Sequence, residues 1–198
     1  MFFHLRCRGA RLLLGACAVS LLSACASLTP VADQPPVVSA ATLQNWQVQG
    51  RLAAINGNES WPASVRWEQN QQIYAVDLIG PLGQGRISVR GDASSVELST
   101  GQERLQARDP DALLAQATGL QVPISGLKYW IRGIPDPATP ARIERNADGR
   151  IARLEQNGWR IDYPNWIQEQ GIDLPKRIQA VQDALKVNIA ITTWTLPQ

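Results

Sequence analysis

Apolar and polar residues alternate with a period of two through most of the chain after residue 44. Trp46, Val48 and Leu52 fall on one side of this pattern, whereas Gln47 and Arg51 fall on the other. The alternation predicts β-strands that bury one face, and turn sequences such as "NADG" and "QNG" separate several of them. The segments with this pattern are 46–54, 61–68, 74–78, 86–90, 96–98, 104–106, 150–155, 159–163, 174–181 and 185–194. We therefore expect a curved antiparallel sheet or half-open β-barrel of about ten or eleven strands.

The middle of the chain departs from the period of two. Asp109 before a proline is typical of a helix N-cap, and Gly119 is typical of the end of that helix. A second short helix is predicted between Ser125, as its cap, and Gly133, and residues 40–47 favour one further helical turn. Two helices inserted in a sheet predict a lid over its concave face. The expected fold class is mainly β with α.

The tryptophan content suggests an apolar cavity under this lid. All seven tryptophans follow residue 25, whereas both phenylalanines precede it. Large rings at the edges of a sheet-and-helix shell can leave an irregular apolar cavity, although the same residues can equally form a sealed core. The candidate cavity residues, chosen because they lie on apolar faces, are Leu52, Val65, Trp67, Val76, Leu78, Trp130 and Ile189.

The N-terminus predicts export and lipidation. A basic stretch precedes an apolar run that ends at Leu22 and is shorter than a membrane-spanning helix, so residues 1–24 are interpreted as a signal peptide. The sequence "LLSAC" at 21–25 resembles the bacterial lipobox. This resemblance implies cleavage before Cys25, a diacylglycerol on its sulfur and an acyl chain on its amine; the alternative is an ordinary cleavage site with a chance cysteine. Residues 25–42, rich in Pro, Ala, Ser and Val, are expected to be a flexible tether to a single domain at 43–198.

Cleavage changes which functions are compatible with the composition. Residues 25–198 number 174, and the loss of three arginines turns the formal net charge from +2 to −1, which gives no electrostatic reason to bind nucleic acid. Cys25 is then the remaining cysteine and no histidine is left, which excludes Ser-His-Asp and Cys-His catalysis and metal sites with His or Cys ligands. A pair of carboxylates stays possible, with Asp77 the one to check. We expect no enzyme, no metal and no cofactor beyond the acyl groups on Cys25.

One turn carries an apolar residue where a polar one is usual. In "DLIGPLGQGRIS", residues 77–88, Pro81 and three glycines surround Leu82, which the glycines cannot bury. Leu82 is therefore expected to project into solvent; the alternative is that it folds back onto a neighbouring loop.

Four segments carry a family resemblance. "TGLQVPISGLKYWIRGIP" at 118–135, "WQVQGRLA" at 46–53, "GPLG" at 80–83 and "LKVNIAITTW" at 185–194 resemble the LolB family, the outer-membrane receptors of bacterial lipoprotein localisation. Together with the lipobox, the resemblance covers essentially the whole chain after the signal peptide. It implies a half-open barrel lidded by helices around an apolar cavity. It also implies that Leu82 is needed to insert cargo into the membrane.

The resemblance further implies a function and its partners. The protein would be anchored in the outer membrane by lipid, facing the periplasm, where it would accept acylated lipoproteins from the soluble carrier LolA and insert them into outer-membrane lipid. We expect it to act as a monomer. Arg51, Arg66, Arg86 and Arg90 are candidates for contact with an acidic rim on the carrier, or else are solvated strand residues.

Two other classes of function stay open on the sequence. A lipid-anchored assembly or interaction protein of the envelope would bind a partner with its sheet and would have a tightly packed concave side. A carboxylate-dependent cell-wall hydrolase would need two carboxylates about 5–10 Å apart across a groove.

Overall fold

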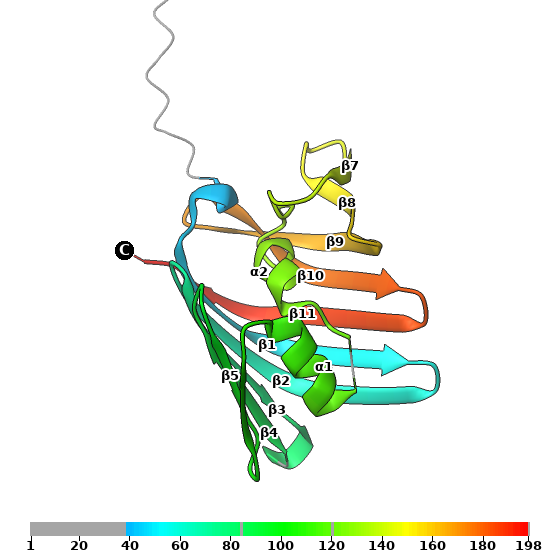
Figure 1. The fold of residues 1–198 in the computed structure, drawn as a ribbon. Coiled ribbons are helices and arrows are strands. Elements are labelled where there is room, and N and C mark those ends of the chain that lie inside the picture. The colour runs from blue at the N-terminus through cyan, green and yellow to red at the C-terminus, as the bar shows by residue number, and fades with distance from the viewer. Residues whose placement is uncertain (1–38, 84, 120, 198) are drawn as a thin grey trace, which may run out of the picture. The chain divides into compact units, whose positions relative to one another are not determined.

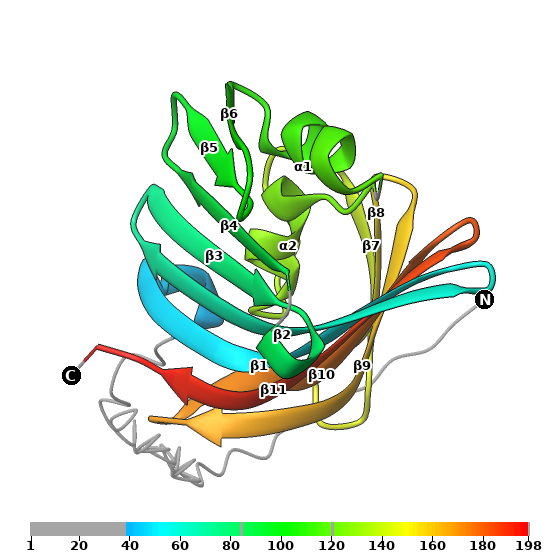
Figure 2. The ribbon, with the colours of Figure 1, turned by 90° about the horizontal axis from the view of Figure 1, so that it is seen from below.

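A single antiparallel sheet of eleven strands forms most of the computed structural model, which describes residues 39–83, 85–119 and 121–197. The predicted signal peptide, Cys25 and most of the predicted tether lie outside these ranges. The spatial order of the strands is β6-β5-β4-β3-β2-β1-β11-β10-β9-β8-β7, so β1 and β11, far apart in sequence, are neighbours at the centre. The sheet curls around two short helices and stays open, because β6 and β7 are its two edges (Figures 1 and 2).

The elements follow the predicted pattern closely. The strands are β1 (Asn45–Asn56), β2 (Glu59–Asn70), β3 (Ile73–Ile79), β4 (Arg86–Gly91), β5 (Val96–Ser99), β6 (Arg104–Ala107), β7 (Ala141–Arg145), β8 (Ile151–Gln156), β9 (Trp159–Glu169), β10 (Ile172–Gln182) and β11 (Leu185–Thr195). The helices are η1 (Ala40–Thr42), η2 (Pro81–Gly83), α1 (Pro110–Thr118) and α2 (Ile124–Trp130), where η marks a 3-10 turn. The sequence missed β7, because all five of its residues are exposed and no apolar face marks it.

The termini of the two helices differ in how well they were predicted. At α1, the Asp109 carboxylate accepts hydrogen bonds from the backbone N–H groups of Asp111 and Ala112, and Gly119 ends the helix in the left-handed conformation, as expected. At α2, the prediction that Ser125 caps the helix is wrong. Pro123 occupies the N-cap without a side-chain bond. Ser125 lies inside the helix, and its hydroxyl donates instead to the Asp111 carboxylate of α1.

The folded domain begins before residue 43. Ala40 is buried in the core, and η1 includes the last three residues of the predicted tether. The guanidinium of Arg132, just after α2, donates to the carbonyl oxygens of Ala40 and Leu43 at 3.2 and 2.8 Å, and to that of Lys128 at 3.1 Å. Burial lowers the pKa of Arg132. This contact joins the start of the domain to the end of α2.

A glycine in β1 sets the approach of the two central strands. At Gly50 the register between β1 and β11 shifts by a bulge, and a Cβ there would lie 2.3 Å from the carbonyl oxygen of Ala190. No side chain fits at that distance, so the central pairing requires glycine. Among the described residues, no helix is both long enough and apolar enough to cross a membrane.

Candidate functional site

The inner face of the sheet is packed against the helices. The seven predicted cavity residues all belong to one buried cluster, and none of their side chains is more than 8 % exposed. Trp130 of α2 is completely buried at the centre. Its ring N–H donates to Gln156 at 2.9 Å, and its carbonyl oxygen accepts the Tyr163 hydroxyl at 3.0 Å. In this conformation the space under the helices is therefore a core, and an acyl chain would need the helices to move.

Pairs of tryptophan rings pack against one another in the core. Trp46 contacts Trp67 and Trp194 with ring centroids 5.5 and 5.8 Å apart, whereas Trp130 contacts Trp159 at 6.1 Å. Tilted rings at such distances stabilise a core beyond the area that they bury. Trp67 and Trp130, which the sequence suggested as cavity residues, are thus packed within the core.

One hollow reaches the inner face from outside. It measures about 350 Å³ and lies between the β1–β2 hairpin, the start of β4 and the C-terminal end of α1. Ala54, Trp61 and Ile87 contribute to it, with Ala54 and Trp61 paired across β1 and β2. Ala117 and Thr118 of α1 complete it. The hollow lies at the edge of the core, and α1 borders it.

The turn between β3 and β4 lies at the same end of the sheet. Leu82, its central residue, is 98 % exposed and adopts a left-handed conformation, with φ 57° and ψ 20°. Hydrogen bonds from the backbone N–H of Gly80 to Gly85 and of Gly83 to Gly80 close the turn. A non-glycine residue in this conformation costs about 1 kcal/mol or more, and Leu82 buries nothing in return. Folding stability therefore does not explain a leucine here.

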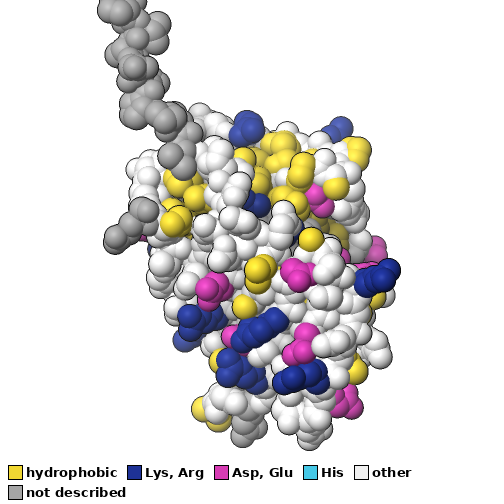
Figure 3. Space-filling model, turned by 60° about the vertical axis from the view of Figure 1, so that its left-hand side comes forward, with side chains coloured by type: hydrophobic (Ala, Val, Ile, Leu, Met, Phe, Trp, Pro, Cys, Tyr) yellow, Lys and Arg dark blue, Asp and Glu magenta, His cyan; other side chains and the backbone are white. Residues whose placement is uncertain are grey.

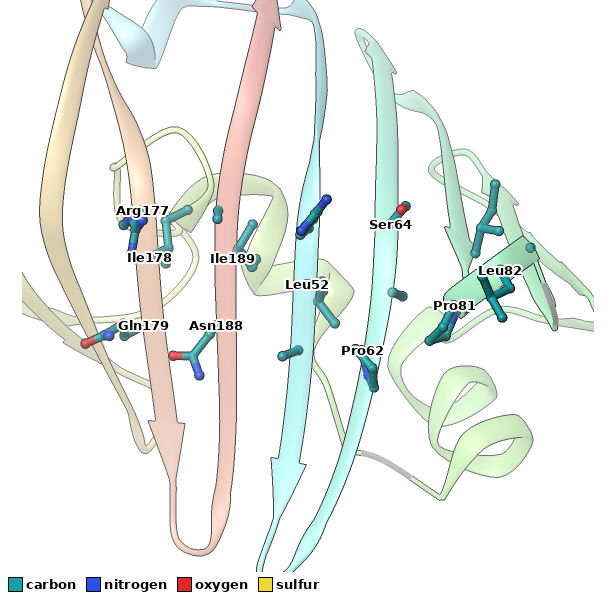
Figure 4. A pocket seen from close by; sticks show the side chains of 17 residues that line it. Leu52, Pro62, Ser64, Pro81, Leu82, Arg177, Ile178, Gln179, Asn188 and Ile189 are labelled. Atoms are coloured by element: carbon teal, nitrogen blue, oxygen red, sulfur yellow. The ribbon is translucent and has the colours of Figure 1, made fainter.

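A hollow larger than the first lies on the other face of the sheet, beside this turn. It is a groove of about 690 Å³ across β10, β11, β1 and β2, and the turn forms one wall (Figure 4). Three cross-strand rows build it. Arg177, Ala190, Arg51 and Ser64 form one row, and Gln179, Asn188, Ala53 and Pro62 another. Both rows face away from the core. The row between them, Ile178, Ile189, Leu52 and Ala63, points inward and is buried.

The charges on the outer face fall into two groups. On β3 and β4, Arg86 and Arg90 lie 3.3 and 3.5 Å from the Asp77 carboxylate, so both are ion-paired. In the groove, Arg51 and Arg177 have no acidic partner among the described residues. On the side shown in Figure 3, basic side chains lie beside acidic ones over the lower half, and hydrophobic side chains gather near the top.

Asp77 has a structural role in this network. Burial raises its pKa, but the hydrogen bond from the Ser88 hydroxyl and the positive charges of Arg90 and Arg86 outweigh burial, so that the pKa falls below its ordinary value. A carboxylate held ionised by two arginines is a poor general acid. The groove contains no Asp or Glu, so it offers no carboxylate pair to a hydrolase. No group of three potential metal ligands occurs in the described ranges.

The sequence missed the groove and its second arginine. Alternation placed Arg51 on the polar face of its strand, but Arg177 gave no signal of its own. Only the observed pairing of β10 with β11 and of β11 with β1 places Arg177 and Arg51 on either side of Ala190. Register between strands distant in sequence is not visible in either strand alone.

Known proteins resemble this chain in sequence and in fold. The family model described as "Outer membrane lipoprotein LolB" matches residues 44–194. The outer-membrane lipoprotein LolB of Pseudomonas aeruginosa strain PAO1 is 36% identical over 195 residues, covering 93% of this chain and 95% of that protein. The protein of the same name from Halorhodospira halophila is 35% identical over 192 residues, with 93% and 95% covered.

Solved structures share the fold at low identity. A LolA superfamily protein from Nitrosomonas europaea superposes with a TM-score of 0.54 at 8% identity, covering 79% of this chain and 88% of that one. A DUF1329 family protein from Desulfovibrio piger gives 0.51 at 7% identity, covering 79% and 87%. These likenesses concern the sheet and its helices alone. The family match and the sequence identities show that the chain belongs to the LolB family of outer-membrane lipoproteins.

Proposed function

We propose that this protein is an outer-membrane receptor that accepts acylated lipoproteins from a periplasmic carrier of the LolA type and inserts them into the outer membrane. The observation that carries the proposal is Leu82, exposed on a turn at the same end of the sheet as the hollow bordered by α1, in a chain of the LolB family. Acyl groups on Cys25 would anchor the protein, facing the periplasm and acting as a monomer. No catalytic residue or cofactor is needed for such a transfer.

Acyl chains explain why the receptor needs an apolar interior. Each buried methylene contributes about 0.8 kcal/mol, so a chain of about 15 methylenes costs about 12 kcal/mol to expose to water. A receptor that offers an apolar interior at the moment of hand-over avoids this cost. The packed core of the observed conformation then represents the empty state, in which the protein's own side chains fill the place of the cargo.

The contacts of the helices indicate which part opens. The C-terminal part of α2 is held by the completely buried Trp130 and by Arg132, whose bonds reach back to residues 40 and 43. By contrast, α1 buries only Leu113 and Leu114 among its nine residues, and its contact with Ser125 of α2 is exposed. Since α1 also borders the inner hollow, movement of α1 would widen the entrance at the smallest loss of buried surface.

Direction would follow from differences in affinity. Cargo moves from the carrier to this protein and then to the bilayer only if each acceptor binds the acyl chains more favourably than the donor. A packed interior that must open before binding supports the second step, because refilling the core by its own side chains favours release. Inserting Leu82 among lipid chains gains about 1.5–3 kcal/mol, enough to orient the entrance but too little to anchor the protein.

A two-stage transfer assay tests the proposal. The first stage measures acceptance of a triacylated lipoprotein from the carrier by the chain from residue 25 with Cys25→Ala, which contains every described residue. The second measures appearance of that lipoprotein in vesicles. We expect Leu82→Glu to accept cargo normally and to slow insertion at least tenfold.

Ile73→Glu is the matched control, because Ile73 is also an exposed apolar residue (63 %) but begins β3, at the far end of the strand from the turn. It should insert cargo at the wild-type rate. Failure of the wild-type chain to accept cargo would contradict the proposal and favour an envelope assembly protein. Normal insertion by Leu82→Glu would remove the role of the turn.

A further inference from the structure

We propose that the groove on the outer face of β10, β11, β1 and β2 binds the phosphates of membrane phospholipid headgroups while Leu82 is inserted. The inference rests on the proposed function. It assigns a ligand to a surface that is separate from the packed core and from the exposed leucine. Four observations carry it: the position of the groove, its two arginines, its free amides and the neutralised arginines next to it.

The position of the groove links it to the membrane. Pro81, Leu82 and Gly83 line the groove together with the four strands, so the groove begins where the exposed leucine is attached (Figure 4). A leucine that reaches the acyl chains brings the surface directly behind it to the headgroup layer. The groove, with a volume of about 690 Å³, is large enough to receive a headgroup.

The two arginines in the groove are arranged for an anion. Arg51 and Arg177 flank Ala190 in one cross-strand row, so their Cα atoms are two strand spacings, or about 10 Å, apart. Both are exposed and neither has an ion pair or a side-chain hydrogen bond within the described ranges. Guanidinium groups bind phosphate through paired hydrogen bonds, and two of them at this spacing can converge on one phosphate or hold two neighbouring ones.

The polar side chains around these arginines are also unoccupied. Gln179 and Asn188 form the next outward row, and neither side-chain amide has a hydrogen-bond partner among the described residues. Amide groups at this place can bind the ester and glycerol oxygens beside a phosphate. No carboxylate lines the groove to repel an anion.

The arginines next to the turn on the neighbouring strands differ from those in the groove. Arg86 and Arg90 both lie on β4, two strands beyond the groove, and both are ion-paired with Asp77 of β3. Arg66 of β2 is also exposed on this face and has no ion pair among the described residues, but it does not line the groove. An acidic partner carrier would be attracted by arginines across the whole face, whereas a ligand bound beside Leu82 needs only the two in the groove. The position of the free pair therefore favours the membrane over the carrier.

Vesicle binding of charge variants tests the inference. The chain from residue 25 with Cys25→Ala is mixed with vesicles of phosphatidylethanolamine containing about a quarter phosphatidylglycerol, and partitioning is measured by flotation. Each basic residue near such a surface contributes about 1 kcal/mol, which is roughly fivefold in partitioning. We expect Arg51→Gln with Arg177→Gln to lower partitioning about 25-fold, and Leu82→Glu combined with both to lower it further.

Arg108→Gln with Arg145→Gln is the matched control, because it removes the same charge from exposed residues that lie outside the groove and have no ion pair among the described residues. Vesicle partitioning of this control variant should stay within about twofold of the wild-type value, because charges more than about 8 Å from the membrane surface are screened at physiological salt. Thermal unfolding of each variant establishes that it folds. Equal losses in the two double variants, or no loss in the groove variant, would overturn the inference.

Two further arms separate the possible ligands. Inorganic phosphate at about 1 mM should leave vesicle binding intact; complete displacement would make the groove a site for a soluble anion and overturn the inference. Wild-type vesicle binding by the groove variant, combined with lost acceptance from the carrier, would make the groove a docking surface for the carrier and also overturn it. Cargo acceptance without vesicles tests the proposed function alone, so the two failures are distinguishable.

Discussion

The two faces of the same four strands have opposite characters. On β10, β11, β1 and β2, the inward row of Ile178, Ile189, Leu52 and Ala63 is sealed under the helices, while the rows on either side carry arginines, amides and open space. Along each strand, successive side chains alternate between the buried inner face and the exposed outer face. The difference teaches that affinity for apolar chains must be obtained by opening a packed core, whereas the outer face can bind a ligand without rearrangement.

Truncating the centre of the core is the strongest test of the sealed face. Trp130→Ala should lower the free energy of unfolding by about 3–5 kcal/mol, because it removes the largest completely buried side chain and leaves Gln156 without one of its partners. Chemical denaturation followed by circular dichroism measures the loss. A loss below about 1 kcal/mol would mean that the space under α2 is already open in solution.

A pair of neighbours on β1 compares the faces directly. Leu52→Ala should cost about 2–3 kcal/mol, since it leaves a hole in the inward row. Arg51→Ala, one residue away on the outward face, should change stability by less than about 0.5 kcal/mol, because it is exposed and unpaired. Denaturation midpoints of the two variants measure the difference. Equal effects would contradict the assignment of the two faces.

The ion pairs of Asp77 with Arg86 and Arg90 predict that folding stability depends on pH. The pKa of Asp77 is lower in the folded state than its ordinary value, so its contribution is complete above the ordinary aspartate pKa of about 3.9 and is lost as the pH falls through the folded value. Asp77→Asn should therefore lower the free energy of unfolding by about 1 kcal/mol or less at pH 7. It should have no effect at a pH below the folded pKa of Asp77, where the carboxyl group is protonated. Denaturation at both pH values measures the two costs, and an equal cost at both would contradict the network.

The smallest effect is expected at the turn. Leu82→Asn should leave stability unchanged or raise it by up to about 1 kcal/mol, because asparagine tolerates the left-handed conformation better and no buried contact is lost. A thermal melt measures the change. Destabilisation by more than about 1 kcal/mol would show that Leu82 packs against the domain, contrary to its exposure.

Much of this architecture could be predicted, because each piece has a local cause. Alternation revealed ten of the eleven strands, and Asp109 and Gly119 marked both ends of α1. The failures share another cause. β7 has no buried face to mark it. The sequence predicts Ser125 as a cap, but its hydroxyl bonds to Asp111 of the other helix, and the sequence of neither helix alone shows that contact.

The candidate site divides in the same way. The exposure of Leu82 could be inferred from its glycine neighbours, which are adjacent in sequence. Neither the closed state of the interior nor the groove could be inferred, because both depend on how distant segments meet. The tryptophans indicated a bulky apolar interior. Composition does not distinguish an open cavity lined by these rings from a core that the rings fill.

Arg132 gives the domain a mechanical property. Its guanidinium donates to the carbonyl groups of residues 40 and 43, at the start of the described chain, and its own backbone continues directly from α2. One side chain therefore couples the first residues of the domain to α2, so that a displacement of either is transmitted to the other. The coupling reaches α1 only through the exposed bonds between Asp111 and Ser125.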